Sequence, residues 1–574
     1  MKQSTNRFLA LIFTLFLSTA SFAQDKSTTA KGSDGRTGTA VAKPVARKPA
    51  TAQSIEAELR EALSLVQGNH VNSKNLNYND VFKASIDSML HALDPHSNYF
   101  DAKEFEQFKT DQSSRYFGIG ATIGDLSDPD GKVIATYIKA TFEGAPAHRA
   151  GLRYGDKIVE VNGQSTLGKA FPDVRTLLRG PQGTTAKLVV ERLATGKRET
   201  LDIVRDSVPQ PSISEVYMIR PGVGYMAMRG GFNQTTFNEF TQGMRQLKAA
   251  GMQQLVIDLR GNGGGLVSHA YRVANAFLAE GQTVFSQKGR VEGVTQPYDA
   301  INRVPDRSPV VVLVDRNTAS ASEILAGALQ DHDRALIVGE TTFGKGLVQN
   351  PFPLEYGSML LLTIAKYETP SGRMIQRDYS NGELYNYYNS GGSLRDEAPV
   401  KAPRGAETKT DTGRSVYSGG GITPDVPVKP DTISIEKARS QNKLASPIFA
   451  FALDLVQGKI KGVETYRIDK PIAFEYDIKA ADFPVTDAVY AAFRQYAANK
   501  YKLTPAQIDR EREYVDRKLR EELVTAAYGS QTAFQVTNEY DKELLKAIEL
   551  LPQARQLAMQ SERAKVNNTQ KDPE

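Results

Sequence analysis

The sequence predicts a multidomain α/β protein that contains a small β-rich module and has helical segments at both ends. A chain of 574 residues is too long for one core and is expected to form about three or four domains. Apolar strand patterns alternate with helical ones from about 212 to 430, and short strands punctuated by glycine fill 115–206. Apolar residues recur at helical spacing before and after these two regions.

The first 23 residues have the layout of a secretory signal peptide. MKQSTNR carries two positive charges, FLALIFTLFL follows at 8–17, and the small residues Ser21 and Ala23 precede the expected cut. The apolar run is too short for a membrane span, and no later run approaches the ~18 residues that a span needs. We therefore expect an exported, periplasmic protein, soluble and without an integral membrane span after signal removal.

Composition argues against several classes of function. The formal net charge of +5, without a dense block of lysine and arginine, gives no reason to expect nucleic acid as a partner. The chain has no cysteine, so it can form no disulfide and has no thiol nucleophile. His96, in LDPHSNYF at 93–100, has no further ligand type at metal-binding spacing, so we interpret it as a turn residue and expect no metal.

Between the signal peptide and the first strands, two segments are predicted. Residues 24–51 are rich in Ser, Thr, Ala, Lys, Gly and Pro without apolar periodicity, which predicts a disordered linker. Residues 52–100 form an N-terminal helical segment, with Ile55, Leu59 and Leu63 at helical spacing.

Three further regions follow in order. They are the β-rich domain at 101–208, the α/β core at 209–430 and the helical region at 431–574. Residues 378–416 of the core are polar and rich in Tyr, Asn, Gly and Ser, and are expected to form a long surface insertion.

The β-rich domain contains YFGIGATI at 116–123 and GLRYGDKIVEVNG at 151–163. The second run, together with the FGIG loop, resembles a PDZ domain. PDZ domains bind extended peptide ends by adding them to a sheet edge. The resemblance implies that the loop amides of Gly118, Ile119 and Gly120 hold a terminal carboxylate.

Two serines open a predicted helix in TASASEI at 318–324, directly after the apolar run PVVVLV. Ser320 and Glu323 have the spacing of a capping box, in which two side chains satisfy free amides of the first helical turn. A serine there can also be a nucleophile, because the free amides and partial positive charge of a helix start favour an oxyanion. The local sequence favours capping and leaves catalysis open.

Two glycine-flanked segments raise a similar question. GNGGG at 261–265 lacks the spacing of a nucleotide-binding loop, and its amides could either form an oxyanion hole or simply a tight turn. Lys345, in TTFGKGLVQ, has glycine on both sides and apolar residues nearby. A lysine that serves as a general base must be neutral, and apolar burial lowers its pKa; the alternative is a surface lysine in a hairpin.

The motifs DLRGNGGG, TASASEILAGALQD, VGETTFGKGLVQ, YETPSGRMIQ and GGGITPDV lie behind the PDZ-like segment. As a set they closely resemble the C-terminal processing peptidases, the serine peptidase family S41 that includes the tail-specific proteases. The resemblance covers about residues 55–430. It implies a crotonase-like α/β protease core with an inserted PDZ domain, and no cofactor.

The family's pattern assigns the site residues. It implies Ser320 as the nucleophile, Lys345 as the general base, and Gln349 as the residue that orients the lysine. The amides of Ala321 and Gly264 would form the oxyanion hole.

Neighbouring residues are assigned other roles. Ser322 lies about 200° around the helix from Ser320 and is expected to face elsewhere and bond backbone. Asp331 is interpreted as a structural residue that supports the site from the helix end. Gly263 stands where the family usually has proline, and neither the insertion at 378–416 nor the helical region is a general family feature.

The resemblance implies an exported, ATP-independent serine endopeptidase. It would accept unfolded or tail-exposed proteins through the PDZ groove, which recognises or gates, and cleave near or from their C-terminal tails through an acyl-enzyme. An adaptor or a second copy of the chain is a further candidate partner.

Two alternatives are open. A histidine-dependent serine hydrolase would need a G-x-S-x-G elbow, which neither serine has, and His332 lies in what looks like an exposed helix end. A catalytically silent peptide- or ligand-binding scaffold of the same fold should have lost the serine, lysine or glutamine, and all three are present.

Overall fold

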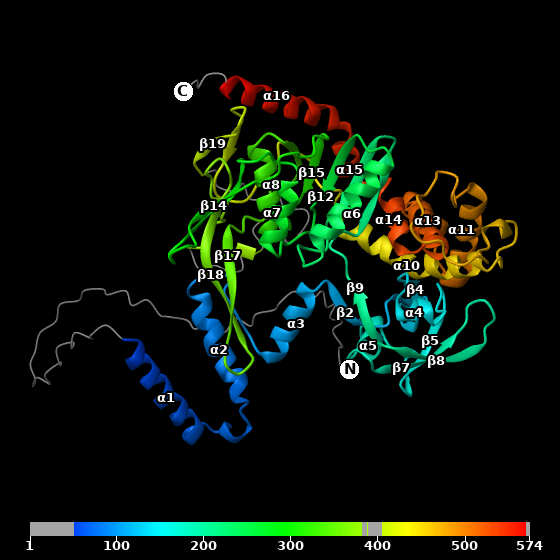
Figure 1. Cartoon of the computed structure of the whole chain (residues 1–574). Helices are drawn as coiled ribbons and strands as arrows, with labels where there is room; N and C mark the ends of the chain where they lie inside the picture. Colours follow the sequence, from blue (N-terminus) through cyan, green and yellow to red (C-terminus); the bar gives the residue numbers. More distant parts are fainter. Residues whose placement is uncertain (1–50, 381–386, 389–404, 570–574) are drawn as a thin grey trace, which may run out of the picture. The chain divides into compact units, whose positions relative to one another are not determined.

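A computed structural model describes residues 51–380, 387–388 and 405–569 (Figure 1). The predicted signal peptide, the linker except for Thr51, and much of the insertion lie outside the described residues. The chain forms two compact units, Met1–Asn77 and Tyr78–Glu574. Among the described residues, no helix has both the length and the apolar character that crossing a membrane would require.

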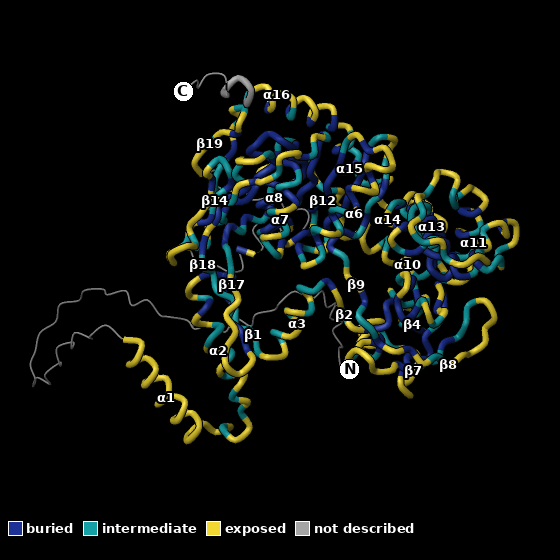
Figure 2. Tube along the Cα trace, viewed as in Figure 1, coloured by how far each residue is buried: buried dark blue, intermediate teal, exposed yellow. Residues whose placement is uncertain are grey.

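In the first unit, the helical periodicity corresponds to α1, Ala52–Asn69. The hydroxyl of Thr51 caps its start by accepting the amide of Ser54 at 3.2 Å. No residue of α1 is buried, as the tube of Figure 2 also shows, so its apolar side chains are exposed.

The core of the second unit is a six-stranded sheet of order β10-β11-β12-β15-β16-β21. Only β10 is antiparallel to its neighbour, and the other pairs are parallel. The strands are β10 (Glu215–Arg220), β11 (Val223–Ala227), β12 (Gln254–Asp258), β15 (Val310–Val314), β16 (Ala335–Gly339) and β21 (Val426–Pro427). The α/β class predicted from the alternation of strands and helices is confirmed.

Both faces of this sheet are covered, which explains why strands such as VVVLV are apolar at every position. Val310, Val312 and Val314 pack under α6 (Thr236–Ala249), α7 (Val267–Asn275) and α8 (Ala321–Asp331). The intervening Val311 and Leu313 pack against α15 (Lys542–Glu549) and α16 (Leu551–Thr569). The two helices lie against β15 and β16, and Figure 1 shows α15 next to β15, so they cover the second face of the core sheet.

A second sheet has the order β1-β18-β13-β14, with β17 also paired to β18. Its strands are β1 (Asn98–Phe100), β13 (Thr283–Gly289), β14 (Gln296–Asp299), β17 (Leu347–Pro353) and β18 (Met359–Glu368). The pairing of β1 with β18 brings the LDPHS segment, which directly precedes β1, next to the lysine-bearing segment that enters β17.

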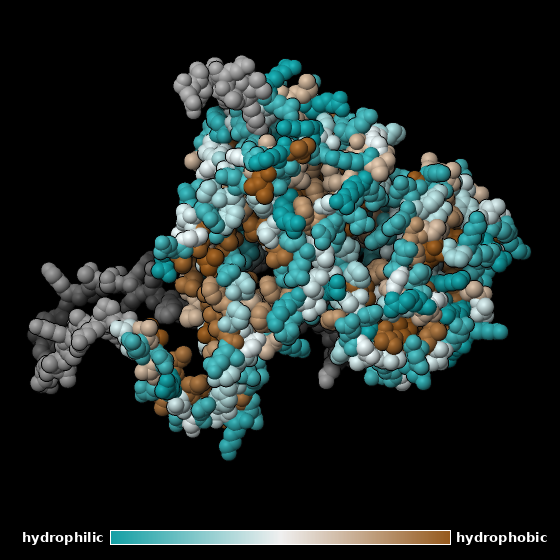
Figure 3. Space-filling model, in the orientation of Figure 1, coloured by the Kyte–Doolittle hydropathy of each residue, from teal (hydrophilic) through white to brown (hydrophobic). Residues whose placement is uncertain are grey.

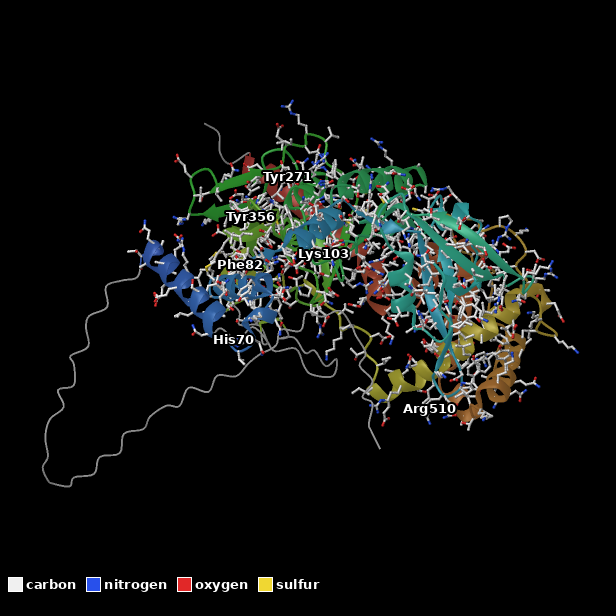
Figure 4. The ribbon with its side chains drawn as sticks, turned by 90° about the horizontal axis from the view of Figure 1, so that it is seen from below. His70, Phe82, Lys103, Tyr271, Tyr356 and Arg510 are labelled. Carbon is white, nitrogen blue, oxygen red and sulfur yellow. The ribbon has the colours of Figure 1, made fainter. Side chains whose placement is uncertain are left out.

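Hydrophobic side chains gather on the molecular surface over β18 and α2, Tyr78–His91 (Figure 3). Phe82 of α2 is 50% exposed and Tyr356, in the turn between β17 and β18, is 87% exposed; both are labelled in Figure 4. Grouped apolar side chains on a surface are typical of places where proteins meet other proteins.

The PDZ region is a small sheet of order β3-β4-β5-β7-β8, with β6 paired to β5. Its edge strand β3 (Ala121–Ser127) lies beside α5 (Phe171–Leu178). The other strands are β4 (Val133–Thr141), β5 (Lys157–Val161), β6 (Gln164–Ser165), β7 (Thr185–Glu191) and β8 (Arg198–Val204). The antiparallel pair β2 (Arg115–Gly118) and β9 (Asp206–Pro209) brings the two ends of the region together.

A bundle of helices packs on the PDZ region. It comprises α10 (Ile435–Val456), α11 (Asp487–Tyr501), α12 (Pro505–Asp509), α13 (Arg512–Tyr528) and α14 (Ser530–Asn538). The ammonium group of Lys139, on β4, pairs with Glu522 and lies 3.3 Å from the ring centroid of Phe449. Tyr154 donates its hydroxyl to the same Glu522 at 2.7 Å. The helical region expected at 431–574 thus has two parts, one on the PDZ region and one on the core sheet.

Glu215 lies where α14 meets the core sheet, and it is 5% exposed. Asn538 donates to its Oε2 at 2.7 Å, and a guanidinium nitrogen of Arg229 is 3.6 Å from its Oε1. Burial raises the pKa of Glu215 to about 7, despite the nearby Arg229.

We expect this residue to make stability depend on pH. In the unfolded chain Glu215 ionises near 4.5, so the free energy of unfolding should fall as the pH rises from about 4.5 through about 7. At about 1.4 kcal/mol per pKa unit, the loss is about 3 kcal/mol. Glu215→Gln removes the titration, and denaturant unfolding at about pH 5 and about pH 8 should reveal a flatter profile than that of the parent. Identical profiles would contradict this assignment.

Candidate active site

Ser320 ends the turn that follows β15 and is the N-cap residue of α8. Its backbone has φ 58° and ψ −118°, a conformation that residues with a side chain rarely adopt. Such strain costs about 1–3 kcal/mol and persists only where the surroundings impose it. The contacts around Ser320 therefore have to hold this turn in place.

The carboxylate of Glu323 provides the main contact. It accepts the amide of Ser320 at 2.8 Å, which is the half of the capping box expected from the sequence. It also accepts the amides of Gly344 and Lys345, at 2.7 and 2.8 Å, and the hydroxyl of Thr342. Glu323 is completely buried, and burial raises its pKa above the ordinary value. One side chain therefore joins the turn that contains Ser320 (the serine turn) to the loop between β16 and β17 that contains Lys345 (the lysine loop).

Tyr367, on β18, makes a second link between the same two segments. Its hydroxyl lies 3.1 Å from the carbonyl oxygen of Ser320 and 3.1 Å from that of Lys345. Tyr367 is 1% exposed, and burial raises its pKa well above the ordinary value, so the hydroxyl keeps its proton. The serine and lysine backbones are thus held around one atom.

The side chain of Lys345 reaches Gln349, to whose Oε1 it donates at 2.8 Å. Gln349 in turn donates its Nε2 to the backbone carbonyl of His96, which fixes the amide oxygen toward the lysine. Burial lowers the pKa of Lys345, and the charges of Asp94 and Glu323 oppose this only in part. The lysine is therefore oriented and shifted toward its neutral form.

The interpretation of His96 as merely a turn residue was incomplete. It does lie in a bend, yet it is 8% exposed, and its Nε2 is 2.6 Å from the hydroxyl of Tyr387. Its ring also packs edge-on against Phe343, with centroids 6.3 Å apart. Burial and the nearby charge of Lys345 lower the pKa of His96 to about 3, so the imidazole is neutral.

Asp94 explains how the His96 segment keeps its shape. Its Oδ1 accepts the amides of His96 and Ser97, both at 2.8 Å, as in an Asx-turn, and its Oδ2 accepts the Ser97 hydroxyl at 2.6 Å. The Ser97 oxygen accepts the amide of Thr363 on β18 at 3.1 Å. The sequence signal for this turn was the DPHS tetrapeptide, whose partners on β17 and β18 are distant in the sequence.

The glycine turn after β12 lies against the serine. Gly264 has φ +98°, and a Cβ added there would lie 2.8 Å from the Cβ of Ser320 and 2.9 Å from the nitrogen of Ala321. In the described chain the amide of Ala321 donates to no protein acceptor, as expected of an oxyanion donor. The amide of Gly264 instead donates to Oδ1 of Asn262 at 2.9 Å, so it is occupied in this conformation.

Ser322 faces away from the lysine loop, as predicted. Its hydroxyl donates to the backbone carbonyl of Asn262 at 3.0 Å, and the same carbonyl accepts the amide of Ala319 at 3.0 Å. The predicted backbone bond of Ser322 is confirmed, and it fixes the glycine turn to the helix start.

Arg260, which directly precedes the glycine turn, also anchors it. The guanidinium donates to Asp258 at 2.7 and 3.0 Å, and to Asp541 at 2.7 and 3.1 Å. It also donates to Glu543 at 2.9 Å. Asp541 caps the start of α15, so the last part of the chain binds the residue that leads into the turn.

Two residues at the far end of α8 support the structure. Asp331 accepts the guanidinium of Arg373 at 2.7 Å and the amide of Ser371 at 3.0 Å, which agrees with its structural interpretation. His332 is 7% exposed rather than at an exposed helix end, so that description was wrong. It lies beyond the 11-residue helix, about 16 Å from the helix start.

The loop Gly118–Ile119–Gly120 joins β2 to β3. In the described chain the amides of Ile119 and Gly120 donate to no protein acceptor. Elsewhere, the described residues contain no group of three or more histidine and carboxylate side chains arranged to hold a metal ion.

Two family models match parts of the chain. The family model for peptidase family S41 matches residues 222–381, and the model for a PDZ domain matches residues 138–192. The PDZ resemblance is thereby confirmed.

Two relatives with similar sequences are named as carboxy-terminal processing proteases. The carboxy-terminal processing protease CtpB of Bacillus subtilis is 33% identical over 338 residues, covering 57% of this chain and 68% of CtpB. The carboxy-terminal-processing protease of Bartonella bacilliformis is 34% identical over 297 residues, covering 51% of this chain and 66% of that protein. The chain thus spans about two thirds of the length of these relatives. A structure of the photosystem II D1 C-terminal processing protease is 26% identical, with a TM-score of 0.33, covering 68% of this chain and 96% of that one.

The glycine turn generates a prediction with an internal control. In Gly264→Ala, the new methyl group would occupy the space in front of the Ala321 amide, so we expect catalytic turnover to fall at least about 10²-fold. In Gly263→Ala, the methyl group meets nothing within 4 Å, and activity should stay close to that of the parent. Steady-state kinetics on a protein substrate will measure both, and equal losses would contradict the space-filling argument.

A second prediction concerns Glu323. Glu323→Gln places an NH₂ group among four donors, so we expect a stability loss of about 3 kcal/mol and loss of turnover. Glu340→Gln is the matched control, because Glu340 pairs with Arg316 nearer the surface. Denaturant unfolding and turnover are measured on both variants, and we expect Glu323→Gln to lose far more stability and turnover than Glu340→Gln. Comparable losses would mean that Glu323 does not hold the two loops together.

Proposed function

The chain belongs to peptidase family S41, the family of the carboxy-terminal processing proteases, and we propose that it is an exported serine endopeptidase that cleaves proteins near or from their C-terminal tails. One observation carries the proposal. Ser320 and Lys345 are tied to each other twice, through Glu323 and through Tyr367, and the lysine is both partly buried and oriented. This arrangement supports a Ser-Lys pair with Gln349 as the orienting residue.

The proposed reaction starts with neutral Lys345. Its Nζ takes the proton of the Ser320 hydroxyl while the serine Oγ attacks the scissile carbonyl carbon. The carbonyl oxygen becomes an oxyanion that the free amide of Ala321 and the helix start stabilise. Gly264 adds a second donor when its amide leaves Asn262.

Collapse of the tetrahedral intermediate breaks the peptide C–N bond. Lys345 returns its proton to the leaving amine, and the acyl group stays on Ser320 as an ester. Water then loses a proton to the lysine, attacks the ester carbon, and releases the new C-terminus. Serine regains its proton from the lysine, so the cycle needs no metal and no ATP.

Several finer features belong to the same proposal. We propose that the core has a crotonase-like fold. Residues 1–23, which lie outside the described residues, are proposed to be the signal peptide for export. Unfolded or tail-exposed proteins are the proposed substrates, taken through the PDZ groove, which recognises them or gates the site. An adaptor or a second copy of the chain is the proposed partner.

The two alternatives make different demands. A histidine-dependent mechanism gains little support, because His332 lies at the opposite end of α8 from Ser320. The neutral imidazole of His96 lies near Lys345, but its Nε2 is engaged with Tyr387. A catalytically silent scaffold would have no need to hold Lys345 in a partly buried, oriented position.

The decisive experiment is degradation of an unfolded protein that ends in free apolar residues. We expect the chain without residues 1–23 to cleave it, and its Ser320→Ala and Lys345→Ala forms to be inactive with unchanged thermal stability. Cleavage that survives in Ser320→Ala would mean that another residue is the nucleophile. Absence of cleavage by every form would favour the binding scaffold.

A further inference from the structure

The groove between β3 and α5 differs from a neutral peptide slot in its charge. We propose that it selects C-terminal tails that have an acidic residue upstream of an apolar last residue. Arg175 is the selecting side chain. The inference rests on the proposed function, because it narrows the substrates of the proposed peptidase to acidic tails.

The groove is shaped for an extended peptide. Strand β3 lies at the edge of its sheet and, among the described strands, pairs with β4 alone, so its other edge can accept a further strand. A pocket of about 200 Å³ lies between this edge and α5. Ile119, Ile123 and Leu178 give it an apolar lining that suits the last side chain of a tail.

One end of the groove is built to receive a carboxylate. The amides of Ile119 and Gly120 donate to no acceptor in the described chain. Arg179 follows the last residue of α5, and its Cγ would lie 3.9 Å from a Cβ added to Gly118. Its guanidinium lies over the ring of Tyr116, 5.2 Å from the centroid. The terminal carboxylate therefore meets two free amides and a guanidinium.

Arg175 lies one helical turn before Arg179, about 6 Å back along α5. Because an extended peptide advances about 3.3 Å per residue, Arg175 lies about two residues upstream of the last residue of a bound tail. Its side chain is exposed, lines the pocket, and forms no ion pair within the described part of the chain.

The nearby carboxylates do not neutralise these arginines. The pocket lining contains two arginines and no aspartate or glutamate. Asp206, across from Gly118, already accepts Gln182, the Ser207 amide and the more distant Arg149. Asp125 accepts the amide of Phe171 and the hydroxyl of Thr136. The groove is therefore positive where a tail would lie, and an acidic residue of the tail would supply the missing partner.

Peptide binding to the full chain carrying Ser320→Ala tests this without any dependence on cleavage. The probes are fluorescein-labelled peptides of about ten residues that differ only at the third residue from the end, as Glu-Ala-Val, Gln-Ala-Val or Lys-Ala-Val. Anisotropy titration should rank them in that order, with about a two- to fivefold step in affinity, and the steps should shrink in about 0.3 M salt.

Variants assign the effect to one side chain. Arg175→Gln should abolish the difference between the glutamate and glutamine peptides, and Arg175→Glu should make the lysine peptide bind best. Arg198→Gln is the matched control, because Arg198 lies on β8 in the same region, near Glu191 and outside the pocket lining. The control should keep the ranking of the parent, and thermal unfolding checks that each variant is folded.

Three results would overturn the inference. Equal affinities for the glutamate and glutamine peptides in the parent would do so, as would a preference that survives in Arg175→Gln. Failure of all three peptides to bind would refute the groove as the tail site. Because binding is measured in a Ser320→Ala chain, these results are independent of whether the parent chain cleaves proteins.

Discussion

The structure around the proposed active site depends on one buried carboxylate. Glu323 accepts four hydrogen bonds from Ser320, Thr342, Gly344 and Lys345, and its side chain has no surface exposed to solvent. A buried carboxylate without partners would cost several kcal/mol, so the two loops can separate only by leaving it unsatisfied. This constraint holds the strained serine turn and the lysine loop at a fixed spacing.

The core sheet places the three segments of the proposed active site side by side. Strands β12, β15 and β16 are consecutive parallel neighbours, so their carboxyl ends meet at one edge. The glycine turn follows β12, Ser320 follows β15, and the lysine loop follows β16. The second sheet then supplies the contacts that fix these loops. Its Tyr367 contacts the backbone carbonyls of Ser320 and Lys345, and His96 of the DPHS turn accepts the side chain of Gln349. The proposed nucleophile and base thus follow strands of the core sheet, and the second sheet orients them.

The sequence could predict what local patterns encode. The helix start at Ser320, its capping by Glu323, the backbone bond of Ser322 and the α/β alternation all follow from spacing within a few residues. It could not predict contacts between distant segments. Nothing near His96 indicates that its carbonyl accepts the Gln349 side chain 253 residues later. Likewise, the helical pattern at 542–557 does not reveal that these helices cover the core sheet.

The anchor beneath the glycine turn makes the finished site a late product of synthesis. Arg260 is separated by 281 residues from Asp541 and by 283 from Glu543. A ribosome adds residues in order, so a growing chain acquires its serine, lysine and glutamine long before these two carboxylates exist. Until α15 and α16 emerge, one face of the core sheet is also uncovered. The serine, lysine and glutamine are therefore synthesised before the helices that stabilise their surroundings. A chain whose synthesis stops early has these three residues but lacks α15 and α16.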